Sequence, residues 1–214
     1  MTAPLVHLVR PPSSDSLAAP LLVLLHGLGS HEEDLFSLEG AFDPDWLVIS
    51  VRAPITLRPG SYAWFPTRFT DRGPVADTEQ AEASRRKLVE FLDWATQEYN
   101  VDPKRVVLAG FSQGAIISAS VALTEPEKVK AAVLMSGRIL PEVLPLVASS
   151  DRRNKTSFLI IHGTDDEVLP VTHGRSSRET LRSLGIEPDY HEFPMAHTIS
   201  DESLSLAVGW IRKF

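Results

Sequence analysis

The most chemically suggestive stretch of the sequence is Gly-Phe-Ser-Gln-Gly, in which Ser112 lies between Gly110 and Gly114. An apolar run over 105–109 precedes this stretch, and a helical pattern follows it. Glycines at these two positions permit a tight turn from strand to helix, where larger side chains would clash with neighbouring backbone. Such a turn exposes a hydroxyl at the end of a buried strand, so Ser112 is a candidate nucleophile. A plain Gly/Ser turn without chemistry is the alternative.

A serine hydroxyl is a weak nucleophile on its own and needs a base and an acid to activate it. Of the seven histidines, only His197 lies downstream between the last short apolar run and the final helical segment. Asp165 and Asp166 both follow the apolar run that ends near residue 161, and their position alone does not decide between them. The order Ser, Asp, His predicts acyl transfer by a hydroxyl nucleophile with an imidazole base.

A second glycine-rich turn, His26-Gly27-Leu28-Gly29, follows the apolar run 21–25. Its Leu28 N–H is a candidate donor to a developing oxyanion, and the N–H of Gln113, directly after the serine, is the other. An ordinary turn between a strand and a helix is the alternative. The rings of His26 and His162, each followed by a glycine, are expected to brace turns.

The chain alternates short apolar runs with helical patterns, which predicts an α/β fold with a mostly parallel sheet of about seven strands. We expect strands over 5–9, 21–25, 47–51, 105–109, 131–135, 158–162 and 190–193, the first and last at the edges because their composition is mixed. We expect helices over 78–99, 113–123, 172–184 and 201–213, with Asp77 capping the first and Ser200 or Asp201 the last. Ligands of such sheets bind at the carboxyl ends of the strands, where the candidate residues gather.

Composition excludes several classes of function. The net charge of −7 argues against nucleic acid and anionic membrane surfaces, and the absence of cysteine excludes thiolate chemistry and disulfides. We expect no cofactor and no metal, since the acidic run 31–34 also suits the first turn of a short helix. The chain has no apolar run of 18 residues and no basic segment before an apolar core, so we expect a cytoplasmic protein.

The motifs "LHGLGS…EEDLF", "AWFP", "GFSQGA", "HGTDDEVLP" and "PMAHTIS" resemble the bacterial carboxylesterase/phospholipase group of α/β-hydrolases, which includes acyl-protein thioesterases. The resemblance runs from about residue 20 to the C-terminus. It implies Ser112 as nucleophile, His197 as base and Leu28 and Gln113 as the oxyanion hole. It also assigns the acid to Asp166, with Pro170 in register. The segment 67–86 departs from the thioesterase-like members.

We therefore expect one α/β-hydrolase domain over 1–214 without a large cap, because only 136–157 separates two neighbouring strands. The expected function is hydrolysis of short to medium acyl esters; thioesterase, lysophospholipase and non-catalytic binding are the alternatives. The excursion 52–77 is a candidate wall of the site, and a homodimer is plausible for the family. The candidate pocket residues are Trp64, Phe65, Ile139, Leu140, Val168 and Met195, although Trp64 and Phe65 would also suit packing of the loop onto the body.

Overall fold

The computed structural model describes residues 2–14, 18–71, 73–153 and 155–214. Its centre is a seven-stranded sheet in the order β1-β3-β2-β8-β9-β10-β11, in which only the edge strand β1 runs antiparallel to its neighbour. The mixed composition of the first and last strands thus predicted their edge positions correctly. The strands are β1 (His7–Arg10), β2 (Ala19–Leu25), β3 (Leu47–Val51), β8 (Val101–Phe111), β9 (Ala131–Met135), β10 (Ser157–Gly163) and β11 (Asp189–Phe193).

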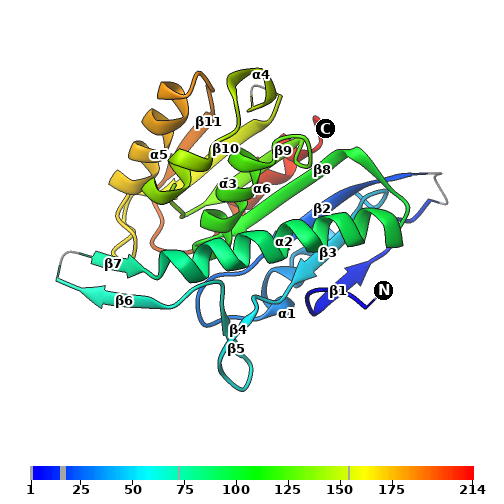
Figure 1. Cartoon of the computed structure of the whole chain (residues 1–214), viewed down its shortest axis with the longest axis horizontal. Helices are drawn as coiled ribbons and strands as arrows, with labels where there is room; N and C mark the ends of the chain where they lie inside the picture. The colour runs from blue at the N-terminus through cyan, green and yellow to red at the C-terminus, as the bar shows by residue number, and fades with distance from the viewer. Residues whose placement is uncertain (1, 15–17, 72, 154) are drawn as a thin grey trace.

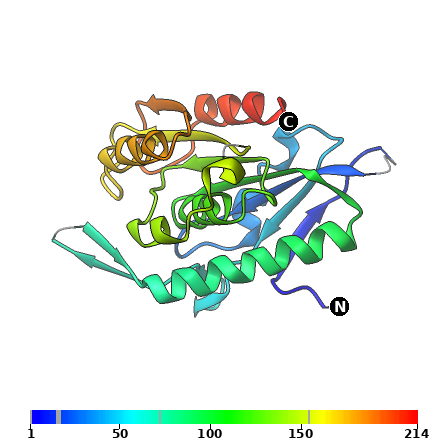
Figure 2. The ribbon, with the colours of Figure 1, turned by 45° about the horizontal axis from the view of Figure 1, so that its top comes forward.

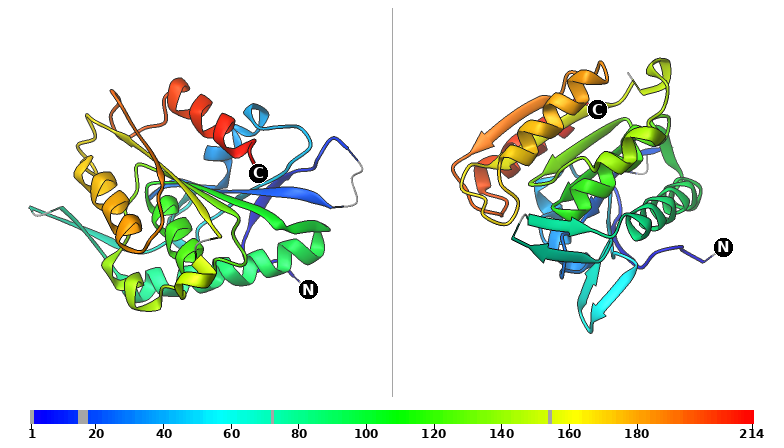
Figure 3. Two further views of the ribbon diagram at one scale, coloured as in Figure 1. Left: turned by 90° about the horizontal axis from the view of Figure 1, so that it is seen from above. Right: turned by 60° about the vertical axis from the view of Figure 1, so that its left-hand side comes forward.

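Helices cover both faces of this sheet, as its near-continuous apolar strands require. One buried apolar cluster lies between the sheet and α2 (Thr78–Glu98), α3 (Gln113–Thr124) and α5 (Thr172–Ser183). The other lies between the sheet and α1 (Glu32–Phe36) and α6 (Asp201–Ile211). Figures 1 and 2 show α2 and α6 on opposite sides of the sheet, and Figure 3 shows the same layers from above and from one side. The α/β-hydrolase prediction is confirmed.

The helices begin where the sequence predicts. The Asp77 side chain accepts a hydrogen bond from the Gln80 N–H at 3.1 Å, and Ser200 Oγ accepts from the Ser203 N–H at 3.2 Å. These caps satisfy N–H groups that the first turn leaves without an intrahelical acceptor. They therefore fix the start of α2 and of α6.

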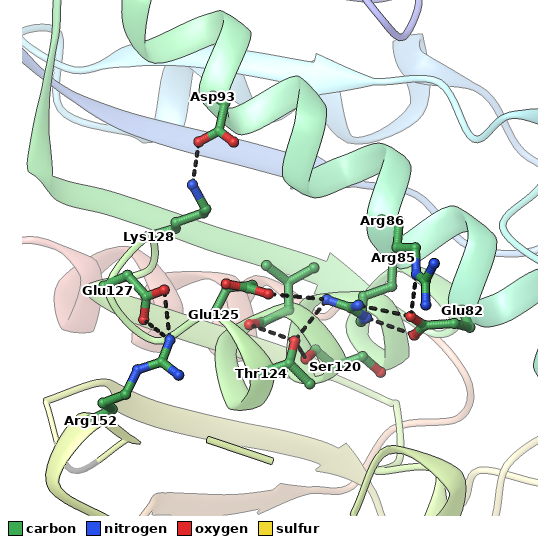
Figure 4. Close-up of polar contacts among 11 residues, drawn as sticks. Glu82, Arg85, Arg86, Asp93, Ser120, Thr124, Glu125, Glu127, Lys128 and Arg152 are labelled. Atoms are coloured by element: carbon green, nitrogen blue, oxygen red, sulfur yellow. Dashed lines mark hydrogen bonds and ion pairs between the residues drawn. The ribbon is translucent and has the colours of Figure 1, made fainter. Parts of the chain in front are cut away.

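A cluster of charged side chains joins α2 to α3 (Figure 4). The Arg85 guanidinium donates two hydrogen bonds to the Glu82 carboxylate, at 2.7 and 2.8 Å, and a third to Thr124 Oγ1 at 2.9 Å. Thr124 Oγ1 in turn donates to the Ser120 carbonyl at 2.8 Å. The largely buried arginine is thus tied to both helices.

The excursion 52–77 is more ordered than the expectation of a long unassigned loop. It forms two antiparallel hairpins, β4 (Ile55–Arg58) with β5 (Ser61–Ala63) and β6 (Thr67–Thr70) with β7 (Gly73–Ala76), which project from the body (Figure 1). The connection from β9 to β10 holds only the 3-10 helix η2 (Pro141–Leu146) and the short α4 (Ser150–Arg153). A further 3-10 helix, η1, spans Glu39–Ala41. No large cap therefore covers the ends of the strands in the described part of the chain.

Candidate active site

Ser112 lies on a strained turn between β8 and α3. Its backbone angles, φ 53° and ψ −115°, fall in a region that residues with a side chain rarely adopt. A Cβ on Gly110 would lie 2.3 Å from the Gly114 carbonyl carbon, and one on Gly114 would lie 2.0 Å from the Leu25 carbonyl oxygen. Both glycines are therefore required by close backbone packing, which is the reason that the sequence suggested.

A continuous chain of hydrogen bonds links three strand ends. Ser112 Oγ lies 3.0 Å from His197 Nε2, and His197 Nδ1 lies 2.7 Å from Asp166 Oδ2. Asp166 follows β10, and His197 lies between β11 and α6. Such distances suit a general base that removes the serine proton and a carboxylate that orients the base.

The carboxylate of Asp166 is held from several sides. Its Oδ1 accepts hydrogen bonds from the N–H groups of Val168 and Leu169, at 3.0 and 2.8 Å, and its side chain is fully buried. The neighbouring Asp165 is exposed, and among the described residues its carboxylate accepts a hydrogen bond only from the Thr164 hydroxyl, at 3.3 Å. The structure thus brings Asp166, rather than Asp165, to the imidazole of His197.

Two buried histidines brace the turns around the site. Nδ1–H of His26 donates to the Gly27 carbonyl at 2.8 Å, and its Nε2 accepts from the Ala53 N–H at 3.0 Å. Nε2–H of His162 donates to the Leu169 carbonyl at 2.7 Å and lies 3.5 Å from Asp166 Oδ2. Burial lowers the pKa of both imidazoles, so both are neutral braces, as expected from the glycine that follows each.

The expected oxyanion donors lie at two neighbouring turns. Gln113 is the first residue of α3, so its N–H has no acceptor within the helix. In the turn after β2, Gly29 N–H donates to the Tyr62 carbonyl and Ser30 N–H to that of Gly27, whereas Leu28 N–H has no acceptor among the described residues. Both amides are therefore available to a ligand at Ser112.

The side chain of Gln113 has a role that the sequence did not indicate. Its Oε1 accepts from the Trp64 N–H at 3.0 Å, and its Nε2 donates to the Phe65 carbonyl at 2.8 Å and to Thr67 Oγ1 at 2.9 Å. The start of α3 is thus hydrogen-bonded to the segment 64–67, which ends at the first residue of β6. No pattern in the sequence pairs residues almost fifty positions apart.

A cavity of about 380 Å³ opens at Ser112. Of the six predicted pocket residues, only Phe65 and Val168 line it. Trp64 is completely buried, and its indole N–H donates to the His26 carbonyl at 3.0 Å, so it packs the loop onto the body. The complete lining is Gly27, Leu28, Ser30, Asp34, Phe65, Thr67, Pro74, Phe111, Ser112, Gln113, Ile116, Arg138, Val168, Leu169 and His197.

Three further pocket predictions are corrected by the packing. Leu140 is buried and faces a different hollow, between α2 and η2, and Ile139 packs against the core cluster on the same face. Met195 is buried in the cluster on the opposite face, and its carbonyl accepts from the Asp165 N–H at 3.1 Å. The loops that carry these residues reach the site, but their side chains pack against the two core clusters.

The sequence matches a family model described as Phospholipase/Carboxylesterase over residues 11–214. The chain belongs to the phospholipase/carboxylesterase family. One relative with a similar sequence is esterase YpfH of Escherichia coli (strain K12). That protein is 29% identical over 208 residues, which are 94% of this chain and 85% of the relative.

Solved structures give the same assignment. The crystal structure of esterase PE8 is 30% identical, with a TM-score of 0.86 and coverage of 98% of each chain. The Bacillus cereus carboxylesterase is 27% identical, with a TM-score of 0.84 and coverage of 98% of this chain and 94% of that one. As a phospholipase/carboxylesterase family member, the protein is an enzyme that hydrolyses carboxylic esters. None of the helices in the described ranges combines the length and the apolar character needed to cross a bilayer.

Two of the cavity residues that the sequence did not indicate are a phenylalanine beside His197 and an arginine. The Phe111 ring lies 4.9 Å, centroid to centroid, from the His197 ring and lines the cavity. Arg138 lines the cavity from the turn after β9. Both follow from the rule already applied to Ser112, because each lies at or just beyond the carboxyl end of a parallel strand.

Proposed function

We propose that the protein is a serine carboxylesterase that hydrolyses short to medium acyl esters through an acyl-enzyme intermediate. The observation that carries this proposal is the hydrogen-bonded series from Ser112 through His197 to Asp166, at 3.0 and 2.7 Å. A turn without chemistry would not need a buried carboxylate aligned behind an imidazole. Non-catalytic binding is correspondingly disfavoured.

In the proposed reaction, His197 Nε2 takes the Ser112 proton as Oγ attacks the carbonyl carbon. Asp166 holds Nδ1–H and stabilises the imidazolium, and the N–H groups of Leu28 and Gln113 bind the tetrahedral oxyanion. Collapse expels the alcohol, which takes its proton from His197 and leaves an acyl-serine. Water, deprotonated by the same imidazole, then releases the acid and restores the serine.

The preference for short to medium chains is supported by the size of the site. A cavity of about 380 Å³ lies near the lower end of the range of about 300–1,000 Å³ that is usual for small-molecule sites. Phe65, Val168 and Ile116 give it an apolar wall. A series of p-nitrophenyl esters tests this preference. We expect the highest kcat/KM at eight carbons or fewer, and a maximum at twelve or more would contradict it.

Labelling with a fluorophosphonate tests the nucleophile itself. We expect one covalent adduct on Ser112 in the wild type and none in Ser112→Ala. Ser205→Ala is the matched control, because Ser205 is an exposed serine on α6 and should leave labelling intact. Absence of an adduct in the folded wild type would favour the binding interpretation.

Thioester hydrolysis is the second candidate function. Acyl-protein thioesterase 1 of Gibberella zeae is 30% identical over 142 residues, which are 64% of this chain and 59% of that protein. Matched butanoyl ester, butanoyl thioester and lysophospholipid substrates would rank the three activities by kcat/KM. We expect the ester to rank first.

The cytoplasmic location and the homodimer stay predictions, which cell fractionation and light scattering would test.

A further inference from the structure

Arg138 brings a positive charge to the cavity at Ser112. It follows the end of β9, which lies beside β8 (Figure 1). The register of these two strands places Met135 beside Phe111, the residue before the serine. A Cβ on the intervening Gly137 would lie 3.3 Å from the Ser112 carbonyl oxygen. The backbone that carries the arginine therefore passes directly beside the nucleophile.

The guanidinium of Arg138 is poorly satisfied within the described part of the chain. Nη2 donates to the Pro74 carbonyl at 3.0 Å, whereas Nε is shut off from water and has no acceptor. Nη1 also has no described acceptor, although it is not sealed off as Nε is. A guanidinium has five N–H donors, so most of its hydrogen-bonding capacity is unused.

The electrostatic surroundings agree with this geometry. Burial lowers the pKa of Arg138, and the exposed Glu142 opposes this effect only from a distance. The pKa of His173 is lowered first by its own burial and then by the nearby Arg138 charge. No carboxylate forms an ion pair with Arg138 among the residues described. A partly buried, unpaired cation is unfavourable unless a ligand supplies the missing anion.

The other charged wall of the cavity lies on the opposite side of the serine. Asp34 belongs to α1, which follows β2, and it accepts the Ser30 hydroxyl at 2.6 Å. Because β2 and β9 flank β8 on either side, Asp34 and Arg138 lie on opposite sides of Ser112. An ester bound across the serine would therefore present one end to a cation.

We propose that Arg138 binds a carboxylate carried by the ester substrate, so that the enzyme prefers esters with a free carboxylate, such as half-esters of dicarboxylic acids. A planar carboxylate matches the two-pronged face of a guanidinium and would supply acceptors for its unused donors. This inference rests on the proposed esterase function and names the substrate class of the same site.

Two matched pairs of esters test the proposal and locate the carboxylate. Monoethyl adipate carries the charge on the acyl side, and its terminal amide is the neutral control. Butanoyloxyacetate carries it on the alcohol side, with butanoyloxyacetamide as control. We expect kcat/KM to favour the acid over the amide by about 10-fold to 100-fold in at least one pair, mainly through a lower KM.

The variants Arg138→Gln and Arg138→Lys separate charge from shape. In Arg138→Gln we expect the preference for the acid to disappear, and in Arg138→Lys we expect part of it to remain. Arg68→Gln, an exposed arginine on the β6–β7 hairpin, is the matched control and should keep the wild-type preference. Circular dichroism confirms that each variant is folded.

The outcomes distinguish the two proposals. Equal kcat/KM for acid and amide in the wild type, or an unchanged preference in Arg138→Gln, would overturn the role of Arg138. Failure to hydrolyse every ester, including p-nitrophenyl acetate, would instead reject the esterase function on which that role depends.

Discussion

Two partly buried arginines of this protein are held in opposite ways. Arg85, between α2 and α3, donates to the Glu82 carboxylate and the Thr124 hydroxyl, with Glu125 at 3.8 Å (Figure 4). The hydrogen bonds to Glu82, ahead of all other causes, raise the pKa of Arg85. Arg138 has one carbonyl acceptor among the described residues, and burial lowers its pKa. The first cation is paired with a carboxylate of its own chain, whereas the second is left for a ligand.

The regions around Arg85 and Arg138 differ in a related way. At the α2–α3 interface, the side chains of Glu82, Arg85 and Thr124 pair with one another within the protein. At the carboxyl edge of the sheet, Ser112 and Ser136 both have positive φ, 53° and 47°. The Ser136 hydroxyl and His162 Nδ1 are buried there without a partner among the described residues. Backbone strain persists where the surrounding fold enforces it, and it is found mainly at functional sites. The difference therefore separates stabilising chemistry from reactive chemistry.

Ser112→Gly gives the largest effect that we expect. Activity should fall by about 10⁴-fold or more, because the nucleophile is lost. The unfolding free energy should be no lower than in the wild type, since relief of about 1–3 kcal/mol of backbone strain exceeds the cost of glycine flexibility, about 0.5–1 kcal/mol. Ester hydrolysis and urea denaturation measure the two quantities.

Ser112→Ala is the matched control for the backbone term. It loses the hydroxyl but keeps a Cβ at φ 53°, so it should be equally inactive without the gain in stability. If Ser112→Gly proved clearly less stable than Ser112→Ala, the turn would not be a source of strain, and the contrast with the α2–α3 interface would weaken.

Asp166→Asn should lower kcat by about 10³–10⁴-fold, because an amide at this position would favour the wrong orientation or tautomer of His197. The control is Asp165→Asn, in which an exposed carboxylate beside Thr164 is changed and kcat should stay within about twofold, as is usual for surface sites. Steady-state kinetics on p-nitrophenyl butyrate decides between them. The reverse pattern would place the acid one residue earlier.

The sequence predicted the parts of this site that depend on backbone topology. Apolar runs predicted where the strands lie. Because parallel strands end at one edge of the sheet, the sequence also predicted that Ser112 and His197 lie close together, and their side chains are in contact in the structure. The orientation of side chains was harder to predict, because it depends on contacts distant in sequence. Trp64 and Phe65 are adjacent, but only Phe65 lines the cavity, since Gln113 and the His26 carbonyl hold the Trp64 backbone and indole.

Arg138 shows a different limit. Its position after a strand end was visible in the sequence, but sequence position does not reveal whether a cation has a partner. Arg85 occupies an i, i+3 pair with Glu82, which could be read from helical spacing. That no carboxylate of the described residues forms an ion pair with Arg138 becomes apparent only when β6–β7 and η2 are placed around it. The sequence therefore predicts an arginine that pairs with a nearby carboxylate more easily than an arginine that is left to bind a ligand.

Arg85→Met should destabilise the protein by about 2–4 kcal/mol, because it leaves the partly buried Glu82 without its main partner. Ester hydrolysis should be unaffected at temperatures where the variant is folded. Arg86→Met is the matched control. Arg86 also donates to Glu82, at 2.7 Å, but its side chain is 71% exposed, so its loss should cost less than about 1 kcal/mol. Urea denaturation measures each value.

Arg138→Met is the corresponding substitution of the arginine that lines the cavity. Removal of a cation with one carbonyl acceptor should leave the unfolding free energy unchanged or slightly higher, while the preference for carboxylate esters is lost. A loss of stability as large as that of Arg85→Met would show that Arg138 is a structural arginine, and the distinction between the two regions would fail.

The smallest expected effect is a pH dependence of stability that arises at the edge of the sheet. Burial lowers the folded-state pKa of His26 and His162 below about 6.5, the ordinary value of a histidine. The unfolded chain therefore binds more protons below pH 6.5, so the unfolding free energy should fall as the pH drops from 6.5 towards 5. Each histidine contributes a slope of at most about 1.4 kcal/mol per pH unit.

His26→Gln should reduce this slope, because the glutamine side chain does not titrate. His191→Gln, at an exposed position on β11, is the control and should keep the wild-type slope. Urea denaturation at pH 5, 6 and 7 measures the three proteins. The sign follows from the lowered pKa: stability is fully present above pH 6.5 and is lost below it. A wild type that gained stability on acidification would show that these imidazoles are charged in the folded protein, and their hydrogen bonds to Gly27, Ala53 and Leu169 would then need a different assignment of protons.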